Sequence, residues 1–256
     1  QGSALGPVLF SVMVSDLKPI SDQNDLIKFA DDMTLLVPES SDTDISTEFQ
    51  AIKRWATENK FIINLQKTKE IIFRRPRPYK PIPPPILQGI ERVIVAKLLG
   101  VYLKDDLSFS YHIDFIITQC AQRMYVLRAM RNRGLPPDCL NVIFAALILS
   151  RIMYGVCAWG GFITAAQHCR LNKVLIKCRR YQYCTSTSVF EDLLVHADRV
   201  LFRKVQSSIH CLNHMLPAIR SSVRMLRDRG HPFTLPVCER ELFKRSFIVR
   251  CLYSQM

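Results

Sequence analysis

Hydrophobic spacing changes character near residue 110 of this 256-residue chain, and that change limits the folds it can adopt. Beyond about residue 111, apolar side chains recur at the spacing of one helical face. The first such set is Ile113, Ile116, Ile117, Cys120, Met124 and Leu127. Before that point, short apolar runs bounded by turn residues predict strands. We therefore expect a mixed α+β part up to roughly residue 105 and a mostly helical part over residues 106–256.

The first part is predicted to combine strands with one amphipathic helix. Residues 25–37 predict two strands around a tight acidic turn, and residues 61–73 and 86–103 predict further strands. Residues 44–59 carry an apolar stripe at helical spacing. The proline-rich residues 76–85 predict an extended connector, because proline cannot continue a helix. In the second part, helices are also predicted at 138–155, 165–182, 189–215 and 239–253.

Charge is distributed unevenly along the chain. Residues 1–50 hold two basic and nine acidic side chains, whereas residues 51–256 hold 33 basic and 13 acidic ones. An acidic start followed by a basic body suits a metal-binding centre beside a polyanion-binding surface. An ordinary basic domain would show the same balance, so charge alone does not decide between them.

One segment, Val142–Ile163, has the length and apolarity of a membrane span. Arg151 near its middle would cost about 2.5–3.5 kcal/mol at a bilayer centre, and three glycines interrupt its second half. We therefore predict a buried helix of a soluble protein and no membrane partner. The nine cysteines form no CxxC pair, and nothing resembles a signal peptide. This pattern predicts reduced thiols and an intracellular location, in the nucleus or cytoplasm, rather than secretion.

Asp31 and Asp32 are the sharpest chemical feature, because two adjacent carboxylates at a hairpin tip repel each other. A divalent cation removes that repulsion, and nucleotidyl transfer by in-line displacement uses two such ions. Ala30 beside them is small enough to let a substrate approach. Taken alone, the pair also fits a solvated turn, since aspartate is common in hairpin tips.

The surrounding motifs resemble those of reverse transcriptases of LINE-type (non-LTR) retrotransposons. Gln-Gly-Ser-Ala-Leu-Gly-Pro-Val-Leu-Phe at residues 1–10 resembles the B motif, and Phe-Ala-Asp-Asp at 29–32 resembles the C motif. Asn-Leu-Gln-Lys-Thr at 64–68 looks like the D region, and Leu-Gly-Val-Tyr-Leu at 99–103 looks like the E region, the primer grip. Tyr154-Gly155 with Trp159 is a weaker similarity. One departure is Lys104, where the family often has Asp.

The resemblance implies roles for individual residues. Asp31 would bind Mg²⁺, for which Mn²⁺ could substitute, and Asp32 would assist it. Gln1 and Gly2 would contact the template and the incoming nucleotide. Phe29 would pack near the primer terminus, although a lone aromatic residue of this kind is more often part of a core.

Four further residues receive roles in the same way. Lys67 would neutralise or protonate the leaving pyrophosphate, or else is an ordinary solvated lysine. Leu99, Gly100 and Val101 would form the primer grip. Gly100 would let the primer backbone come close, and the alternative is a strand glycine at a bulge.

The fold implied by the resemblance is α+β. Residues 1–105 would be a partial polymerase palm, an antiparallel sheet with helices, and residues 106–256 a helical thumb and C-terminal extension. The implied activity is extension of a DNA primer on an RNA template, with deoxynucleoside triphosphates as substrates and Mg²⁺ as cofactor. The basic second part would bind phosphates.

The family's fingers and the strand that carries another metal-binding Asp lie upstream of the B motif. We therefore expect a fragment that is inactive alone and requires that segment. Two alternatives stay open. One is a non-catalytic nucleic-acid-binding remnant of a decayed retroelement, and the other is a relative of RNA-dependent RNA polymerases.

Overall fold

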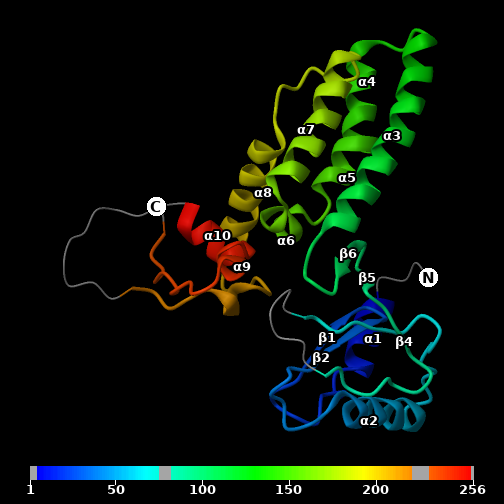
Figure 1. Ribbon diagram of the computed structural model, residues 1–256, viewed down its shortest axis with the longest axis vertical. Coiled ribbons are helices and arrows are strands. Elements are labelled where there is room, and N and C mark those ends of the chain that lie inside the picture. Colours follow the sequence, from blue (N-terminus) through cyan, green and yellow to red (C-terminus); the bar gives the residue numbers. More distant parts are fainter. Residues whose placement is uncertain (1–4, 75–81, 221–230, 255–256) are drawn as a thin grey trace. The chain divides into compact units, whose positions relative to one another are not determined.

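The computed structural model describes residues 5–74, 82–220 and 231–254. The chain packs as two units, and each is described by itself. The first unit comprises residues 1–70 and 82–93, and the second comprises residues 71–81 and 94–256. Helices and small antiparallel sheets both occur, so the α+β prediction is confirmed at this level (Figure 1). The palm and thumb names and the division at residue 105 stay predictions.

The first unit combines two helices with two small sheets. In chain order its elements are α1 (Gly6–Met13), β1 (Asp25–Phe29), β2 (Asp32–Leu36), α2 (Ile45–Glu58), β3 (Lys69–Glu70) and β4 (Glu91–Arg92). Strands β1 and β2 pair antiparallel, and β3 and β4 pair parallel. Helix α2 begins where the Asp44 carboxylate accepts a hydrogen bond from the Thr47 amide at 2.7 Å. Its Phe49 packs with Leu87 and Ile90 in a small core.

Two expectations for this part of the chain were wrong. Residues 61–73 are not a long strand, because only Lys69–Glu70 pair. Residues just before them form a turn around Asn64, whose side chain accepts from the Lys67 amide at 3.1 Å and whose carbonyl accepts from the Thr68 hydroxyl at 2.9 Å. Such local bonds compete with a strand ladder. Within the described ranges there is also no single antiparallel sheet, but three separate two-stranded ones.

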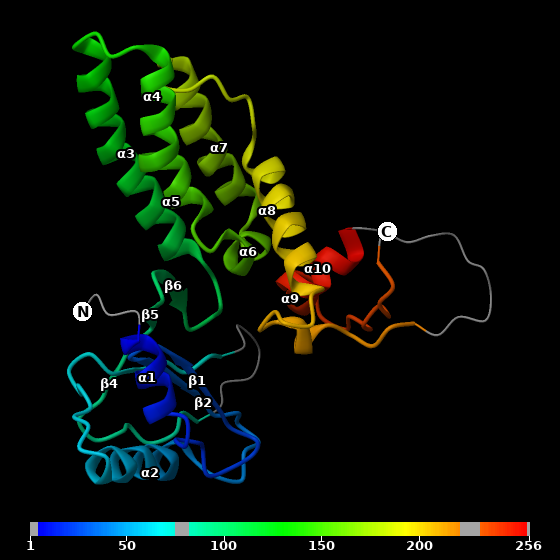
Figure 2. The same ribbon diagram turned by 180° about the vertical axis from the view of Figure 1, so that it is seen from behind.

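The second unit is a helical body preceded by one hairpin. It begins with β5 (Val95–Leu98), β6 (Val101–Lys104) and the long helix α3 (Ser110–Asn132). The central helices are α4 (Pro137–Phe144), the π-helix η1 (Ala145–Leu149), α5 (Ser150–Met153), α6 (Val156–Trp159), the 3-10 helix η2 (Gly160–Phe162) and α7 (Ala165–Arg180). The last elements are α8 (Phe190–Val205), η3 (Asn213–Met215), α9 (Glu241–Lys244) and α10 (Phe247–Ser254). Helices α3, α4–α5 and α7 lie side by side in both views (Figures 1 and 2).

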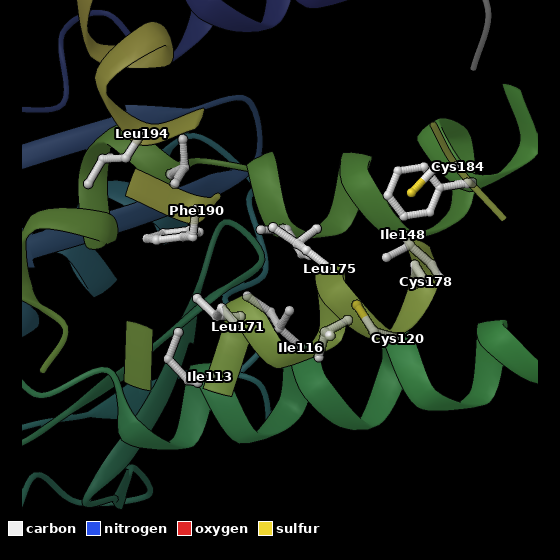
Figure 3. Close-up of a cluster of buried hydrophobic side chains, with 14 of the residues drawn as sticks. Ile113, Ile116, Cys120, Ile148, Leu171, Leu175, Cys178, Cys184, Phe190 and Leu194 are labelled. Carbon is white, nitrogen blue, oxygen red and sulfur yellow. The ribbon is translucent and has the colours of Figure 1, made fainter. Parts of the chain in front are cut away.

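The core of the second unit lies between α3 and its neighbours (Figure 3). Ile113, Ile116, Cys120 and Leu127 of α3 are buried, as the helical spacing predicts. Ile113, Ile116 and Cys120 face Leu171, Leu175 and Cys178 of α7 and Ile148 of η1 across this core. Each fully buried aliphatic side chain contributes about 1.5–3 kcal/mol. This unit therefore draws its stability mainly from apolar burial.

The long apolar segment is only partly a core helix. By length and composition, Pro137–Phe162 could cross a membrane, with a mean hydropathy of 1.9, and 28% of that window is buried. Leu140, Phe144, Ile148 and Ile152 are buried in the unit. The chain turns sharply at Gly155, which has a φ of +59°. The prediction of a buried helix thus holds for one face of a bent segment, while other residues of it are exposed.

A partly buried ion pair fastens the last helix to the body. The Arg250 guanidinium donates to both carboxylate oxygens of Asp198 on α8, at 2.8 and 2.9 Å, and to the Cys157 carbonyl at 3.1 Å. Gly161 makes room for it, since a Cβ there would lie 1.9 Å from Arg250 Nη1. Residues 157, 161, 198 and 250 are therefore one packed cluster.

Two long helices predicted from the sequence are shorter in the structure. Helix α8 ends at Val205, whose carbonyl accepts from the Asn213 side chain at 2.9 Å, so the predicted helix over 189–215 stops ten residues early. The predicted helix over 239–253 is two helices, α9 and α10. They are separated at Arg245, whose carbonyl accepts from Arg250 Nη1 at 2.5 Å.

Candidate active site

The adjacent carboxylates lie at the tip of the β1–β2 hairpin, as predicted. Phe29 pairs with Asp32, so Ala30 and Asp31 form a two-residue turn. Of these two, only Ala30 has a positive φ, at +50°, the mark of a type II′ turn. A residue with a Cβ is strained there, and such strain concentrates at functional sites. Asp31 and Asp32 are both exposed, so the turn holds two acceptor groups open to solvent.

Buried contacts fix the segment that leads into this hairpin. The Glu48 carboxylate on α2 is fully buried and accepts from the Ile20 amide at 2.9 Å and the Ser21 amide at 2.9 Å. It also accepts from the Asn24 side chain at 2.8 Å. Burial by itself raises the pKa of Glu48, but the hydrogen bonds from Ser21, Asn24 and Ile20 outweigh it and the pKa is lowered. The charged carboxylate thus ties residues 20–24 to α2.

A second contact joins the hairpin itself to the end of α1. The Lys28 ammonium on β1 donates to the Val14 carbonyl beyond the end of α1. Burial lowers the pKa of Lys28, while Asp16 nearby partly offsets this. The hairpin is therefore joined to α1 as well as preceded by an anchored loop.

The carboxylate pair fits a magnesium ion in chemistry but supplies only part of a site. Mg²⁺ prefers hard oxygen ligands and keeps several waters beside one or two carboxylates. Asp31 and Asp32 offer such oxygens at one turn. Across the parts of the chain that the structure describes, no three His, Cys, Asp or Glu side chains gather to hold a metal. The two carboxylates therefore fit a metal ion whose remaining ligands come from other groups.

The remaining predicted residues of the first unit differ in how much the structure says of them. Phe29 is 62% exposed, so its ring is not part of a core. Lys67 follows the Asn64 turn and is exposed. Gln1 and Gly2 lie outside the described residues. The roles assigned to these four residues stay predictions.

The predicted primer grip forms the β5–β6 hairpin of the second unit. Leu98 pairs with Val101, and the turn residues Leu99 and Gly100 both have positive φ, +45° and +89°, as in a type I′ turn. Gly100 is therefore a turn residue and not a bulge. Its open side is occupied by Tyr154, because a Cβ on Gly100 would lie 2.9 Å from Tyr154 Cε1.

Two residues that hold these hairpins received no role from the sequence. The Tyr154 hydroxyl donates to the Leu99 carbonyl at 2.9 Å, so Tyr154 fixes the tip of the β5–β6 turn. The signal for Glu48 was its place on α2 beside Ile45, Phe49 and Ile52, because a charged residue within an apolar stripe must find buried partners. Tyr154 offered only its similarity to a weak family feature.

Comparisons with known proteins agree with these motifs. Residues 1–111 match the family described as reverse transcriptase (RNA-dependent DNA polymerase). Three similar proteins come from Drosophila melanogaster. The RNA-directed DNA polymerase from mobile element jockey is 31% identical over 192 residues, 69% of this chain and 20% of that protein.

The other two relatives are similar over more of the chain. The probable RNA-directed DNA polymerase from transposon BS is 27% identical over 224 residues, covering 77% of this chain and 24% of that protein. The probable RNA-directed DNA polymerase from transposon X-element is 26% identical over 261 residues, covering 89% and 28%. The chain thus spans between 20% and 28% of the length of these relatives. No solved structure matches the chain.

Proposed function

Because the chain belongs to the reverse transcriptases of LINE-type (non-LTR) retrotransposons, we propose that it contributes part of the active site of an RNA-directed DNA polymerase. The substrates are an RNA template, a DNA primer and deoxynucleoside triphosphates. The observation that carries the proposal is the two-residue turn that presents Asp31 beside Asp32. The neighbouring motifs favour this assignment over an ordinary solvated turn.

In this proposal each hairpin has its own task. Asp31 holds a divalent cation, Mg²⁺ or Mn²⁺, with Asp32 beside it, and the bound ion stabilises charge on the reacting phosphate. Phe29 packs against the primer terminus, and Lys67 places a positive charge near the leaving pyrophosphate. The turn at Leu99 and Gly100 holds the primer strand.

We propose that the remaining metal ligand comes from another part of a longer polypeptide. Strands β1 and β2 form a sheet of only two strands within the described residues, and Ile27 on it is 54% exposed. Helix α1 has no buried residue, with Val8 at 59% and Val12 at 65% exposure. An additional strand carrying an aspartate would cover this apolar surface and complete the site. The 256-residue chain alone is then inactive.

The basic second unit is proposed to be the thumb that binds the nucleic acid. We place the activity inside the cell, since the nine cysteines are free, as reduced thiols require.

The test is a chimaera in which this chain replaces the corresponding part of the jockey polymerase. Primer extension on an RNA template is expected, and Asp31→Asn should lower its rate at least about 100-fold. Asp32→Asn should lower it less. The matched control is Asp25→Asn, an exposed carboxylate at the other end of β1, which should extend primers at the parent rate.

Three outcomes would overturn the proposal. Unchanged extension after both Asp31→Asn and Asp32→Asn would remove the metal assignment. A chimaera that binds hybrid duplex but never extends it would favour a non-catalytic remnant. Preferred incorporation of ribonucleotides would favour an RNA-dependent RNA polymerase.

A further inference from the structure

The β5–β6 turn has a conformation that its own sequence does not favour. Leu99 has a φ of +45° and Gly100 a φ of +89°. Asn-Gly or Asp-Gly is preferred in such a turn, because a left-handed backbone is disfavoured for a residue with a large side chain. Leu99 is 40% exposed, so burial of its side chain explains little of this conformation. Contacts from outside the hairpin must therefore maintain the turn.

The bend between α5 and α6 supplies the first of these contacts. The Tyr154 hydroxyl donates to the Leu99 carbonyl at 2.9 Å. The Tyr154 ring covers Gly100, since a Cβ there would lie 2.9 Å from Tyr154 Cε1. Gly155, the next residue, lies against β6, where a Cβ on it would be 3.5 Å from Val101 Cγ2. Tyr154 thus contacts both left-handed residues of the turn.

The second contact comes from the first turn of α3. His112 is 3% exposed, and its Nδ1 accepts a hydrogen bond from the Tyr102 amide of β6 at 3.4 Å. An accepting Nδ1 places the proton of the neutral imidazole on Nε2. Burial lowers the pKa of His112 to about 4, so this neutral form persists at neutral pH. The strand that leaves the turn is therefore held by an uncharged histidine.

Trp159 joins these two contacts within the core of the second unit. Its indole N–H donates to the Tyr154 carbonyl at 2.9 Å, and its ring meets the His112 ring edge-on, with the ring centres 5.2 Å apart. The contacts form a closed path through Leu99, Tyr154, Trp159, His112 and Tyr102. The hairpin lies at the end of the helical body where α3 begins (Figures 1 and 2). The turn is thus fixed to a rigid core at two points.

Stability of the fold does not require the Tyr154 hydroxyl at this place. The Tyr154 side chain is 54% exposed, so water would satisfy its hydroxyl about as well as a carbonyl does. The hydroxyl nevertheless bonds to the residue of the turn whose backbone is strained. Strain of this kind is concentrated at functional sites. The contact is better explained by a need to fix the shape of the turn.

We propose that Tyr154 and His112 are positioning residues for primer extension, which hold the Leu99–Gly100 turn in the conformation that places the primer terminus. The proposal rests on the proposed function, in which this turn holds the primer strand. Neither residue needs to touch a substrate. Because the reacting atoms must lie at the right distance and angle, a small shift of the turn should lower the rate of nucleotide addition more than the affinity for the duplex.

The first experiment measures amide hydrogen exchange at Val101 and Tyr102 in the 256-residue chain. Tyr154→Phe removes the hydroxyl and keeps the ring, and it should accelerate this exchange about fivefold. His112→Leu should do the same, whereas His112→Asn keeps an acceptor oxygen near the place of Nδ1 and should restore most of the protection. Leu99→Asn makes the turn Asn-Gly, which favours this conformation by itself, so in that background Tyr154→Phe should change the exchange by less than about twofold.

The second experiment measures single-nucleotide extension, per active site, by the chimaera of this chain with the jockey polymerase. Tyr154→Phe should lower the extension rate about tenfold and leave the dissociation constant of the primer–template duplex within about twofold of the parent value. In the Leu99→Asn background the same change should lower the rate by less than about twofold. Tyr125→Phe on α3 is the matched control, since its ring is 74% exposed, and it should keep the parent rate. A merely structural role would lower the amount of active enzyme but not the rate per active site.

An unchanged extension rate in Tyr154→Phe would overturn the positioning role, and so would an equal loss with and without Leu99→Asn. Duplex affinity that falls in proportion to the rate would overturn it as well, because Tyr154 would then be a binding residue. Failure of the parent chimaera to extend any primer would overturn the proposed function instead. The exchange experiment on the 256-residue chain needs no polymerisation, so it decides separately whether the two residues hold the turn.

Discussion

The two units differ in charge and in how they are held together. The first has eight basic and twelve acidic side chains, and among its described residues the cluster of buried apolar side chains is small, formed by Phe49, Leu87 and Ile90. The second has 27 basic and ten acidic side chains and a large apolar core around α3 and α7. Both units leave apolar side chains exposed, but the second has much the larger buried core. Local hydrogen bonds must carry more of the stability in the first unit.

Two buried carboxylates, Glu48 in the first unit and Asp198 in the second, are compensated differently. Glu48 is surrounded by neutral N–H donors, whereas Asp198 is paired with the Arg250 guanidinium. Neutral donors fix a loop without adding charge near the hairpin. A guanidinium also reaches carbonyls on several elements, which suits the assembly of helices. The predictions below test whether the two units depend on different forces.

Trp159→Ala should have the largest effect and should be confined to the second unit. Trp159 is fully buried, donates to the Tyr154 carbonyl at 2.9 Å and stacks on Phe190. Truncation should cost about 3–5 kcal/mol. The remaining tryptophan, Trp55, lies in the first unit, so its fluorescence during urea unfolding reports that unit separately. Peptides from α3, followed by hydrogen exchange, report the second.

The control for this change is Tyr125→Ala on α3, where the side chain is 74% exposed and stability should hardly change. The contrary result is that Trp159→Ala destabilises the first unit, measured by Trp55 fluorescence in urea, as much as the second, measured by hydrogen exchange of α3. That result would show that the two units do not unfold independently and would contradict the contrast between them.

Acid should weaken the second unit before the first. Burial lowers the pKa of His112 from 6.5 to about 4. The unfolded chain therefore binds a proton at a higher pH than the folded chain, and stability falls as pH drops from about 6.5 towards 4. This loss is at most about 3 kcal/mol, at about 1.4 kcal/mol for each pH unit. The pKa of Glu48 is lowered below 4.5, so its contribution disappears only below about that pH.

Hydrogen exchange of α3 and α2 between pH 7 and 4 checks this order, after correction for the intrinsic exchange rate. Loss of protection in α2 first, or in both together, would contradict it.

Glu48→Gln should destabilise the first unit by about 2 kcal/mol, because one acceptor oxygen becomes an amide that faces a backbone N–H. The midpoint of the Trp55 transition in urea measures the loss. Glu58→Gln, an exposed change on the same helix, serves as the control. An effect of Glu48→Gln no larger than that of the control would show that the buried network contributes little.

Tyr154→Phe should have the smallest effect, about 1 kcal/mol, since one hydrogen bond to the Leu99 carbonyl is lost and the ring remains. Amide exchange at Val101 and Tyr102 should accelerate while the core of α3 is unchanged. Gly100→Ala is the companion variant, because its Cβ would clash with the Tyr154 ring. Combining it with Tyr154→Ala should remove that clash, and an additive loss instead would argue against the contact.

Several elements were predictable because local residues determine them. The sequence predicts two strands around the acidic turn within residues 25–37, and the structure has a hairpin that pairs Asp25 with Leu36 and Phe29 with Asp32. The stripe from Ile113 to Leu127 gives α3, whose buried face is the predicted one. In both cases the spacing of the hydrophobic residues and the flanking turn residues predict the same type of element.

Other features depend on partners far away in the sequence. Ser207 to Met215 seemed to continue a helix, but Asn213 folds back on Val205 and ends it. The sequence predicts either a close approach of the primer or a bulge at Gly100. In the structure Gly100 is a turn residue with a positive φ, and the Tyr154 ring packs against its open side. The hydrogen bond from Tyr154 to the Leu99 carbonyl joins residues 55 positions apart, which no local pattern reports. The roles of Asp31, Asp32, Lys67 and the primer grip depend on substrates and stay predictions.

The Arg250 cluster has a consequence for the order of events during synthesis. Arg250 leaves the ribosome 93 residues after Cys157, whose carbonyl it caps. Until then Asp198 has no cation, and the hollow beside Gly161 is empty. A ribosome that stopped between Asp198 and Arg250 would release a helical body with an uncompensated carboxylate in its interior, a target for chaperones and proteases.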